Sequence, residues 1–342
     1  MIQRIFTILF IFSYSLLLAQ QKCTISGYLT DAESGEQLIS ANLFSVKGLQ
    51  GTTTNTYGFY SLTLPKGKVQ LKLSYVGYVE QILDIDLTKD IELNVKMSQS
   101  SLLQELEVSA TKAERIEQRT QMSRIDIPIQ QIKKIPSLLG EVDVLKALQL
   151  LPGVQGGTEG QSGLYVRGGG PDQNLITLDG VPVYNVSHLL GFFSVFNADA
   201  IKNVTLYKGG FPARYGGRLS SVIDIQMKEG NDQKFHGEGS VGLVSSKLTL
   251  EGPILKNKAS FIVSARRTYV DAFLKPILAL SNNNNSQNPN QTQNVGLKLY
   301  FYDVNAKVNY KINTKNHVYL SAYTGKDVFG SDNYTNSCNF YE

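Results

Sequence analysis

The chain of 342 residues contains little cysteine, little histidine and no tryptophan. Its only two cysteines, Cys23 and Cys338, exclude a disulfide scaffold and a cysteine-based metal site. Its three histidines, His188, His236 and His317, lie far apart in the sequence and do not have metal-ligand spacing. We therefore expect neither a bound metal nor a cofactor.

Net charge is also small, since the formal value is +4 at pH 7. A charge of this size over this length does not indicate a nucleic-acid partner. No set of nucleophile, base and acid can be assembled from the order of residues, so we do not expect an enzyme. The chain does have 18 tyrosines and 30 glycines, which suit strands and tight turns, and it has room for two or three domains. These features predict a mainly β protein.

The first 19 residues have the pattern of a secretory signal peptide. Arg4 supplies the positive end, and an apolar run follows that closes near Ala19. The alternative is a membrane anchor, but the run is short for a span and no stop-transfer charges follow it. Cys23 is preceded by Lys22, where a lipoprotein signal needs a small residue, so we do not expect lipidation. The pattern predicts export across the inner membrane.

Residues 20–98 read as short strands separated by regular turn signals. This spacing predicts a small β-sandwich. The residues expected in its core are Ile25, Leu43, Phe59, Leu62, Leu71, Leu73, Ile85 and Leu93. The segment has no histidine and no acid pair, so we expect a binding or spacer role. Residues 99–124 are polar, lack glycine and proline, and predict a linker that contains one short β-capable run, 106–110.

Residues 125–230, called the plug region below, carry one helical pattern. Val142, Leu145, Leu148 and Leu151 have helical spacing, Ser137 is the expected N-cap, and Pro152-Gly153 ends the helix. A second, short helix is expected around Ala198 to Ile201, before a strand.

A glycine-rich stretch, GLYVRGGGPDQNLITLDGVPVY at 163–184, predicts a chain of tight hairpins. Gly168, Gly169 and Gly170 allow backbone angles that other residues avoid. Asp179-Gly180 is the strongest signal for a two-residue hairpin.

From residue 231 onward, the pattern changes to long alternating strands, expected near 235–244, 246–252, 258–271, 299–312 and 316–329. In 300–312 one face is apolar with tyrosine at both ends, and the other is polar except at Phe301. Short links at 252–258 and 313–316 alternate with a long one at 274–296, as in a transmembrane β-barrel. Five strands cannot close a barrel, and the chain ends Phe340-Tyr341-Glu342 without a terminal aromatic residue. We therefore expect an incomplete barrel, belonging to the front part of a longer protein.

The run VRGGGPDQNLITLDGVPVYN, with NADAIKNVTLYKGGFPARYGGRLSSVIDI at 197–225, resembles the plug domain of TonB-dependent outer-membrane receptors. Residues 23–98 separately resemble the carboxypeptidase-regulatory-like domain found at the front of such receptors in Bacteroidetes-type bacteria. The resemblance implies a sandwich in the periplasm, an α+β plug and the first strands of an outer-membrane barrel. It also implies active uptake of a scarce solute, such as a siderophore, glycan, peptide or cofactor.

The resemblance further implies roles for individual residues. The segment that pairs with TonB by β-augmentation would be Leu106, Glu107, Val108, Ser109 and Ala110; alternatively, this run is an ordinary linker or the last strand of the sandwich. Arg167 and Arg214, with Arg218 as a weaker third, would pair with glutamates of the barrel wall, because a charge in the lumen must be paired or hydrated.

The partners implied are the TonB–ExbB–ExbD complex, outer-membrane lipid, a surface lipoprotein, and a small solute or oligomeric ligand. Three alternatives stay open: a surface-binding or adhesion protein without transport, a signal transducer, and a soluble periplasmic carbohydrate enzyme. His188 is either a ligand contact or an ordinary loop residue.

Overall fold

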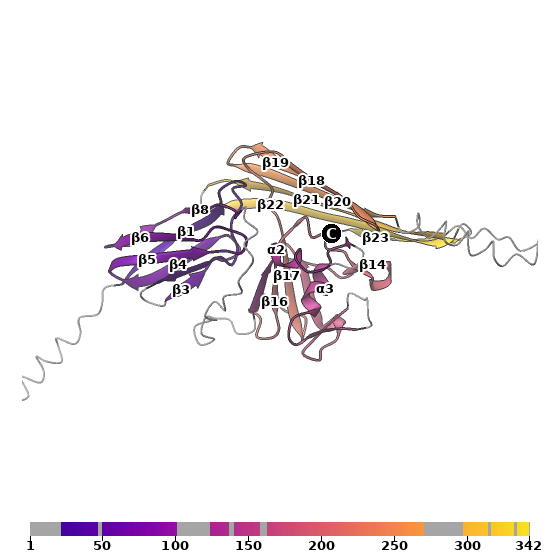
Figure 1. Cartoon of the computed structure of the whole chain (residues 1–342). Helices are drawn as coiled ribbons and strands as arrows, with labels where there is room; N and C mark the ends of the chain where they lie inside the picture. Colours follow the sequence, from indigo (N-terminus) through magenta and orange to yellow (C-terminus); the bar gives the residue numbers. More distant parts are fainter. Residues whose placement is uncertain are drawn as a thin grey trace, which may run out of the picture. The chain divides into compact units, whose positions relative to one another are not determined.

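A computed structural model describes residues 22–46, 50–100, 124–136, 140–157, 163–269, 297–313, 316–331 and 334–341 (Figure 1). The chain divides into two compact units, one made of residues 1–32 and 37–103 and the other of residues 33–36 and 104–342. Within the described residues, no helix is long and apolar enough to cross a membrane. The signal peptide expected over 1–19 lies outside the described residues.

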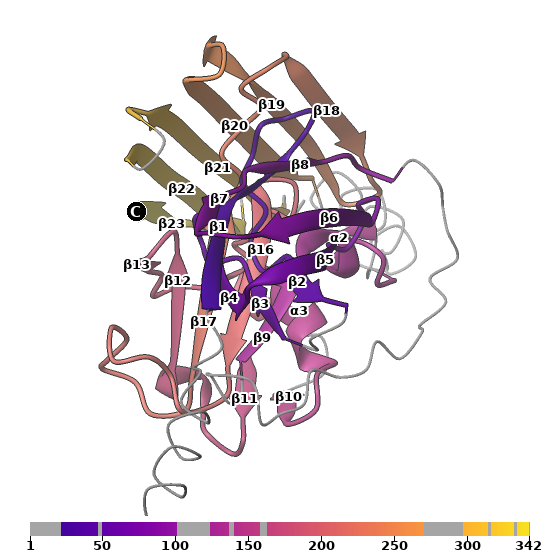
Figure 2. The same cartoon turned by 90° about the vertical axis from the view of Figure 1, so that its left-hand side faces the viewer.

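The first unit is a sandwich of two β-sheets, in which most neighbouring strands are antiparallel (Figure 2). One sheet contains β1 (Lys22–Asp31), β4 (Phe59–Pro65), β7 (Ile91–Glu92) and β8 (Val95–Met97). The other has the order β3 (Gly51–Thr53), β2 (Asn42–Ser45), β5 (Gly67–Ser74) and β6 (Gln81–Leu87). Five of the expected core residues, Ile25, Leu43, Leu62, Leu71 and Leu73, are buried between the sheets, and Ile85 and Leu93 pack at the margin.

The expectation for Phe59 was wrong by one residue. Successive side chains of a strand point to opposite faces, and in β4 the buried positions are Tyr60, Leu62 and Leu64. Phe59 therefore lies on the outer face, where its ring packs edge-on against Tyr28 at 5.3 Å. Tyr60 takes the inward position and donates its hydroxyl hydrogen to the Leu93 carbonyl at 2.7 Å.

The buried hydroxyl of Tyr60 predicts a change of stability at alkaline pH. Burial raises the pKa of Tyr60 to about 12, so its contribution is complete below pH ~10 and is lost as the pH rises through 12. Tyr60→Phe should remove this alkaline loss and cost about 1 kcal/mol at neutral pH, because the Leu93 carbonyl loses its donor. Urea denaturation from pH 7 to 12 measures both effects. The exposed Tyr57→Phe is the control and should change neither.

The second unit contains the plug region, whose strands form a five-stranded sheet. Its order is β13 (Val181–Pro182), β12 (Asn174–Leu178), β17 (Ser221–Met227), β16 (Ile201–Tyr207) and β9 (Arg124–Pro128). One face of this sheet packs with α2 (Ile129–Ile132) and α3 (Val144–Gln149) in a shared hydrophobic core. That core also includes β10 (Val154–Gly156) and β11 (Leu164–Val166), which pair with each other.

The helix is shorter than the apolar spacing predicted. α3 begins after Asp143, whose side chain accepts from the N–H groups of Leu145 and Lys146 at 2.9 and 3.1 Å. An N-cap must be adjacent to the first helical residue, so Ser137, which lies outside the described residues, cannot cap this helix. The expected helix from Ala198 to Ile201 is also absent: residues 198–200 form a turn, and Ile201 already begins β16.

The glycine-rich stretch contains two tight two-residue turns, one at Arg167-Gly168, where Val166 and Gly169 exchange backbone hydrogen bonds at 3.2 and 2.9 Å, and one at Asp179-Gly180. Asp179 and Gly180 both have positive φ, 50° and 89°, and join β12 to β13 as a two-residue turn. Gly168 has a φ of 86°, and Gly169 and Gly170 lead into the short 3-10 helix η3 (Pro171–Gln173). However, β11 pairs with β10, and β12 lies parallel to β17, so the two strands on either side of these glycines do not pair with each other.

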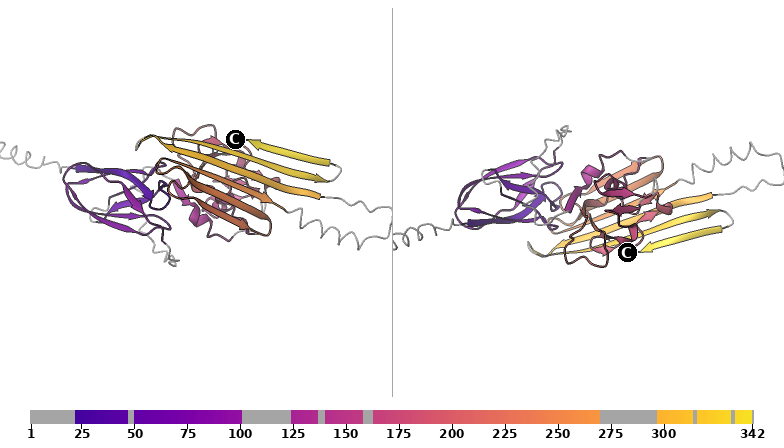
Figure 3. Two further views of the ribbon diagram at one scale, coloured as in Figure 1. Left: turned by 90° about the horizontal axis from the view of Figure 1, so that it is seen from above. Right: turned by 90° about the horizontal axis from the view of Figure 1, so that it is seen from below.

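β14 (Ser187–His188) and β15 (Phe193–Ser194) pair with each other, and the strands after residue 235 form a six-stranded antiparallel sheet in chain order (Figure 3). They are β18 (His236–Val241), β19 (Ser245–Leu255), β20 (Ala259–Thr268), β21 (Leu297–Lys311), β22 (His317–Ser331) and β23 (Tyr334–Tyr341). All five predicted strands are present. β23 was not predicted, because its sequence YTNSCNFY is mostly polar and only its pairing with β22 defines it.

The two faces of this sheet differ in the predicted way. On β21, Phe301, Asp303, Asn305, Lys307 and Asn309 point toward the plug region and are buried. The intervening Tyr302, Val308 and Tyr310 are exposed on the other face. An exposed apolar face opposite a polar face is the pattern of a transmembrane barrel strand. The fold is thus mainly β, with a sandwich, an α+β plug region and an open set of barrel-type strands among the described residues.

Candidate functional site: the contact between the plug region and the six-stranded sheet

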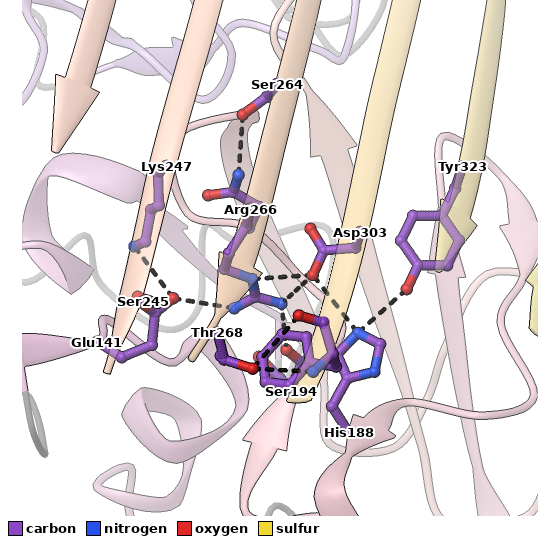
Figure 4. Close-up of polar contacts among 12 residues, drawn as sticks. Glu141, His188, Ser194, Ser245, Lys247, Ser264, Arg266, Thr268, Asp303 and Tyr323 are labelled. Carbon is purple, nitrogen blue, oxygen red and sulfur yellow. Dashed lines mark hydrogen bonds and ion pairs between the residues drawn. The ribbon is translucent and has the colours of Figure 1, made fainter. Parts of the chain in front are cut away.

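Arg266 on β20 is the centre of the contact (Figure 4). It is 2% exposed, and its guanidinium donates to Asp303 of β21 at 2.8 and 2.6 Å. It also reaches two groups of the plug region: the Glu141 carboxylate at 2.9 Å and the Ser194 carbonyl at 2.8 Å. Phe301 lies 4.9 Å from the guanidinium carbon and covers its face. Arg266 therefore connects the sheet to two plug segments at once.

Glu141 is the plug carboxylate with the most partners from the sheet. Besides Arg266, its Oε1 lies 3.0 Å from the Lys247 ammonium, and its Oε2 accepts from the Ser245 hydroxyl at 2.6 Å. Both carboxylate oxygens are thus satisfied, which a buried carboxylate requires. All the sheet partners come from β19 and β20, so Glu141 binds two adjacent strands.

His188 makes the corresponding contact to β21 and β22. It belongs to β14 (Ser187–His188) and is fully buried. Its Nδ1 lies 2.7 Å from Asp327, its Nε2 lies 3.4 Å from Asp303, and its ring stacks on Phe301 at 4.1 Å. This stacking explains why Phe301 breaks the polar pattern of the inward face of β21.

Local structure in the plug region brings these groups together. The Asp143 carboxylate that caps α3 also accepts from the Ser194 N–H at 2.8 Å. Ser194 belongs to β15 (Phe193–Ser194), which pairs with β14. A single carboxylate therefore fixes the start of α3 beside β15, which places Glu141 and the Ser194 carbonyl on the same guanidinium.

A second contact lies at the Asp179-Gly180 turn. The Asp179 carboxylate is 3.0 Å from Lys307 of β21 and accepts from the Met227 N–H at 2.9 Å. The Asp179 carbonyl accepts from the Tyr319 hydroxyl at 3.2 Å. The hairpin that the sequence predicts therefore holds β12, β17 and two strands of the sheet at one point.

Two further carboxylates of this unit are kept ionised by lysines. Burial acts to raise the pKa of Glu229, but Lys202, Lys307 and neighbouring cations lower it below its ordinary value. Burial likewise opposes ionisation of Asp199, but Lys133 at 2.5 Å lowers the pKa of that carboxyl. Glu229 is thus stabilised in its ionised form by bases of both the plug region and the sheet, whereas the close partner of Asp199, Lys133, belongs to the plug region itself.

Arg167 and Arg214 occupy turns in the plug region. Arg167 has a φ of 49°, and its N–H donates to the Gly153 carbonyl at 3.0 Å. Arg214 donates to the Tyr215 hydroxyl at 3.1 Å and lies over the same ring. The pairing of these arginines with barrel glutamates stays a prediction. The expected TonB segment, 106–110, lies outside the described residues, and within the described part no three acid, cysteine or histidine side chains could hold a metal ion.

The residues that do form the contact were mostly missed, although the alternation had placed some of them on the inward face. Asp303 and Lys307 belong to the polar side of β21 that the sequence identified. Glu141 and His188 carry no sequence signal for this role, since a single acid or histidine in a loop has many possible environments. Arg266 lies on the inward face of β20, but the sequence alone did not distinguish it. The buried positions on that face are Ser260, Ile262, Ser264, Arg266 and Thr268.

Comparison with known families gives two matches. The model described as "TonB-dependent Receptor Plug Domain" matches residues 108–222. The chain carries the plug domain of the TonB-dependent receptors. The model described as "CarboxypepD_reg-like domain" matches residues 25–109. Both matches agree with the resemblances found in the sequence.

Individual relatives of the chain are distant. It is 27% identical over 209 residues to "TonB-dependent receptor P39" of Formosa agariphila, a match that covers 58% of this chain and 19% of that protein. "TonB-dependent receptor P3" of the same organism is 29% identical over 84 residues, which cover 25% and 8% of the two chains. The match thus spans less than a fifth of the length of these relatives.

Among solved structures, the siderophore receptor PirA from Acinetobacter baumannii is similar with a TM-score of 0.42 and 20% identity, covering 63% of this chain and 32% of that one. The ferric enterobactin receptor PfeA from Pseudomonas aeruginosa has a TM-score of 0.41 and 18% identity, covering 60% and 33%.

Proposed function

We propose that the chain belongs to an outer-membrane receptor that takes up a scarce solute by active transport, driven by the TonB–ExbB–ExbD complex. The observation that carries the proposal is the six-stranded sheet, whose inward polar side chains are buried against a plug domain while its outward face is apolar and exposed. Such a sheet suits a lipid environment, with the plug on the lumen side.

The domains follow from this proposal. A signal peptide over 1–19 exports the chain, and a sandwich over 20–98 lies in the periplasm. A linker over 99–124 carries the TonB segment, the plug occupies 125–230, and the barrel strands begin at 231. Arg167 and Arg214 pair with glutamates of the barrel wall. The solute is a siderophore, glycan, peptide or cofactor, and a surface lipoprotein is a further partner.

Coupling to TonB depends on main-chain hydrogen bonds made by residues 106–110. An extended segment that adds to a sheet edge donates through its backbone N–H groups, and proline has none. Val108→Pro is therefore expected to abolish energy-dependent uptake and to reduce TonB binding at least tenfold, whereas Val108→Ala keeps both. Binding is measured by titrating the purified receptor with the periplasmic domain of TonB.

The alternative functions give different results in the same experiment. An adhesion or surface-binding protein would retain its activity in Val108→Pro. A signal transducer would lose signalling while showing no uptake in either form. Equal uptake and equal TonB binding by the proline and alanine variants would contradict the assignment of residues 106–110.

A further inference from the structure

The segment that follows His188 has an unfavourable backbone conformation. Leu189 and Leu190 both have positive φ, 48° and 59°, in the left-handed region. Branched apolar residues rarely adopt this conformation, and two in succession occur only where the surroundings impose it. The next residue, Gly191, also has a positive φ, 101°, which glycine tolerates. The question is which contacts hold the two leucines.

One end of the segment is held by Asp327 of β22. Its Oδ1 lies 2.7 Å from His188 Nδ1, and its Oδ2 accepts from the Leu189 N–H at 3.2 Å. Both carboxylate oxygens therefore bind consecutive residues at the point where the left-handed conformation begins. On the other side of the imidazole, Asp303 and the Tyr323 hydroxyl each lie 3.4 Å from Nε2.

The other end is held by α3 and β20. The Lys146 ammonium donates to the Phe192 carbonyl at 2.7 Å, and Arg266 donates to the Ser194 carbonyl at 2.8 Å. Leu189 packs with Phe193 and Phe301 in a small apolar cluster. Between the two fixed ends, Leu190 is 80% exposed and Phe192 is 51% exposed. The segment is thus a short strap, pinned at both ends, with two apolar side chains on its outer surface.

We propose that His188 and Asp327 form a latch that holds residues 189–190 in the left-handed conformation only while the plug is seated against β22. When the plug moves away from β22, both hydrogen bonds to Asp327 break, and the leucines relax to a right-handed conformation. Because such coupling is reciprocal, a change that relaxes the strap also weakens the hold of the plug on β22. The latch concerns only the strap and β22, so it holds whether or not the protein transports a solute.

Hydrogen–deuterium exchange of the whole chain in phospholipid vesicles tests the latch. Asp327→Ala removes both acceptors, so amides in the peptide spanning 186–195 should exchange at least tenfold faster than in the wild type. Lys326→Ala is the matched control, since it changes the neighbouring residue of the same strand, which points to the other face, and should leave this peptide unchanged. Protection in the sandwich serves as an internal reference for folding.

Two substitutions of His188 separate its two carboxylate contacts. An asparagine amide occupies the position of Nδ1, whereas a glutamine amide reaches the position of Nε2. His188→Asn should keep the contact to Asp327 and retain most of the protection, and His188→Gln should keep only the contact to Asp303 and lose it.

Leu190→Asn should slow the exchange of the strap, in contrast to Asp327→Ala. Asparagine tolerates the left-handed region, and the exposed leucine side chain makes few contacts that would be lost. Exchange of the strap is expected to become about threefold slower. The latch is overturned if Asp327→Ala and His188→Gln exchange like the wild type, or if Leu190→Asn accelerates exchange. A wild-type protein that shows the latch but does not bind TonB would instead count only against the proposed function.

Discussion

Arg266→Met is expected to destabilise the seated plug by about 3–5 kcal/mol, the largest effect of any single substitution in the contact. The substitution leaves the carboxylates of Glu141 and Asp303 buried without the guanidinium that pairs with both. Removing one partner of a buried ion pair costs more than the pair itself contributes, because the remaining charge keeps its desolvation penalty. The measurement is the free energy of unfolding in phospholipid vesicles, obtained by denaturant titration.

Arg267→Met is the matched control for this experiment. Arg267 is the next residue of β20, is exposed on the opposite face, and lies over the Tyr300 ring. Replacing Arg267 should lower the free energy of unfolding by less than about 1 kcal/mol. If the two methionine variants lose the same stability, the contact around Arg266 does not hold the plug.

Combining Arg266→Met with Glu141→Gln gives a further check on the same pair. The amide removes the charge that Arg266 neutralises but can still accept from Ser245. We therefore expect the double variant to lose less stability than the sum of the single losses, because residues in direct contact are energetically coupled. Additive losses would show that Arg266 and Glu141 are not energetically coupled.

The second large effect is expected on the outer face of the six-stranded sheet. Val304→Arg places a charge midway along β21, at a partly exposed side chain on the same outward face as Tyr302 and Val308. In a bilayer this position should cost about 2–4 kcal/mol, since a cation near the midplane is poorly solvated. In a water-soluble sheet the same substitution would cost almost nothing, because an exposed arginine is solvated.

Ile312→Arg controls for depth. It changes an apolar residue that is 57% exposed on the same face, just beyond the end of β21. An arginine near the membrane interface costs only about 0–1 kcal/mol. The difference between the two variants, measured by denaturant titration in vesicles, should therefore be about 2 kcal/mol or more. Equal costs would mean that this face does not lie in lipid, and the transport proposal would fail with it.

Much of the fold could be predicted because it depends on local patterns. The strict alternation in 300–312 identified both faces of β21, and Asp179-Gly180 identified a turn that requires positive φ at both residues. By contrast, α3 was placed too long because apolar spacing does not show where a helix starts. That start is set by Asp143, whose carboxylate also binds Ser194, a residue far along the chain. The prediction placed Phe59 in the core, whereas the structure buries Tyr60. The sequence could not distinguish them, because either alternation of faces along the strand buries an aromatic ring.

The sequence by itself determined the mainly β architecture, the resemblance of 23–98 and of the plug region to two known domains, and the two faces of the barrel-type sheet. These are set by periodicity and by short motifs, which are read from neighbouring residues. Only the tertiary structure decided which charges meet. Arg266, Glu141, Asp303 and His188 come from four segments of the chain, and a buried charge is stable only where another segment supplies its partner.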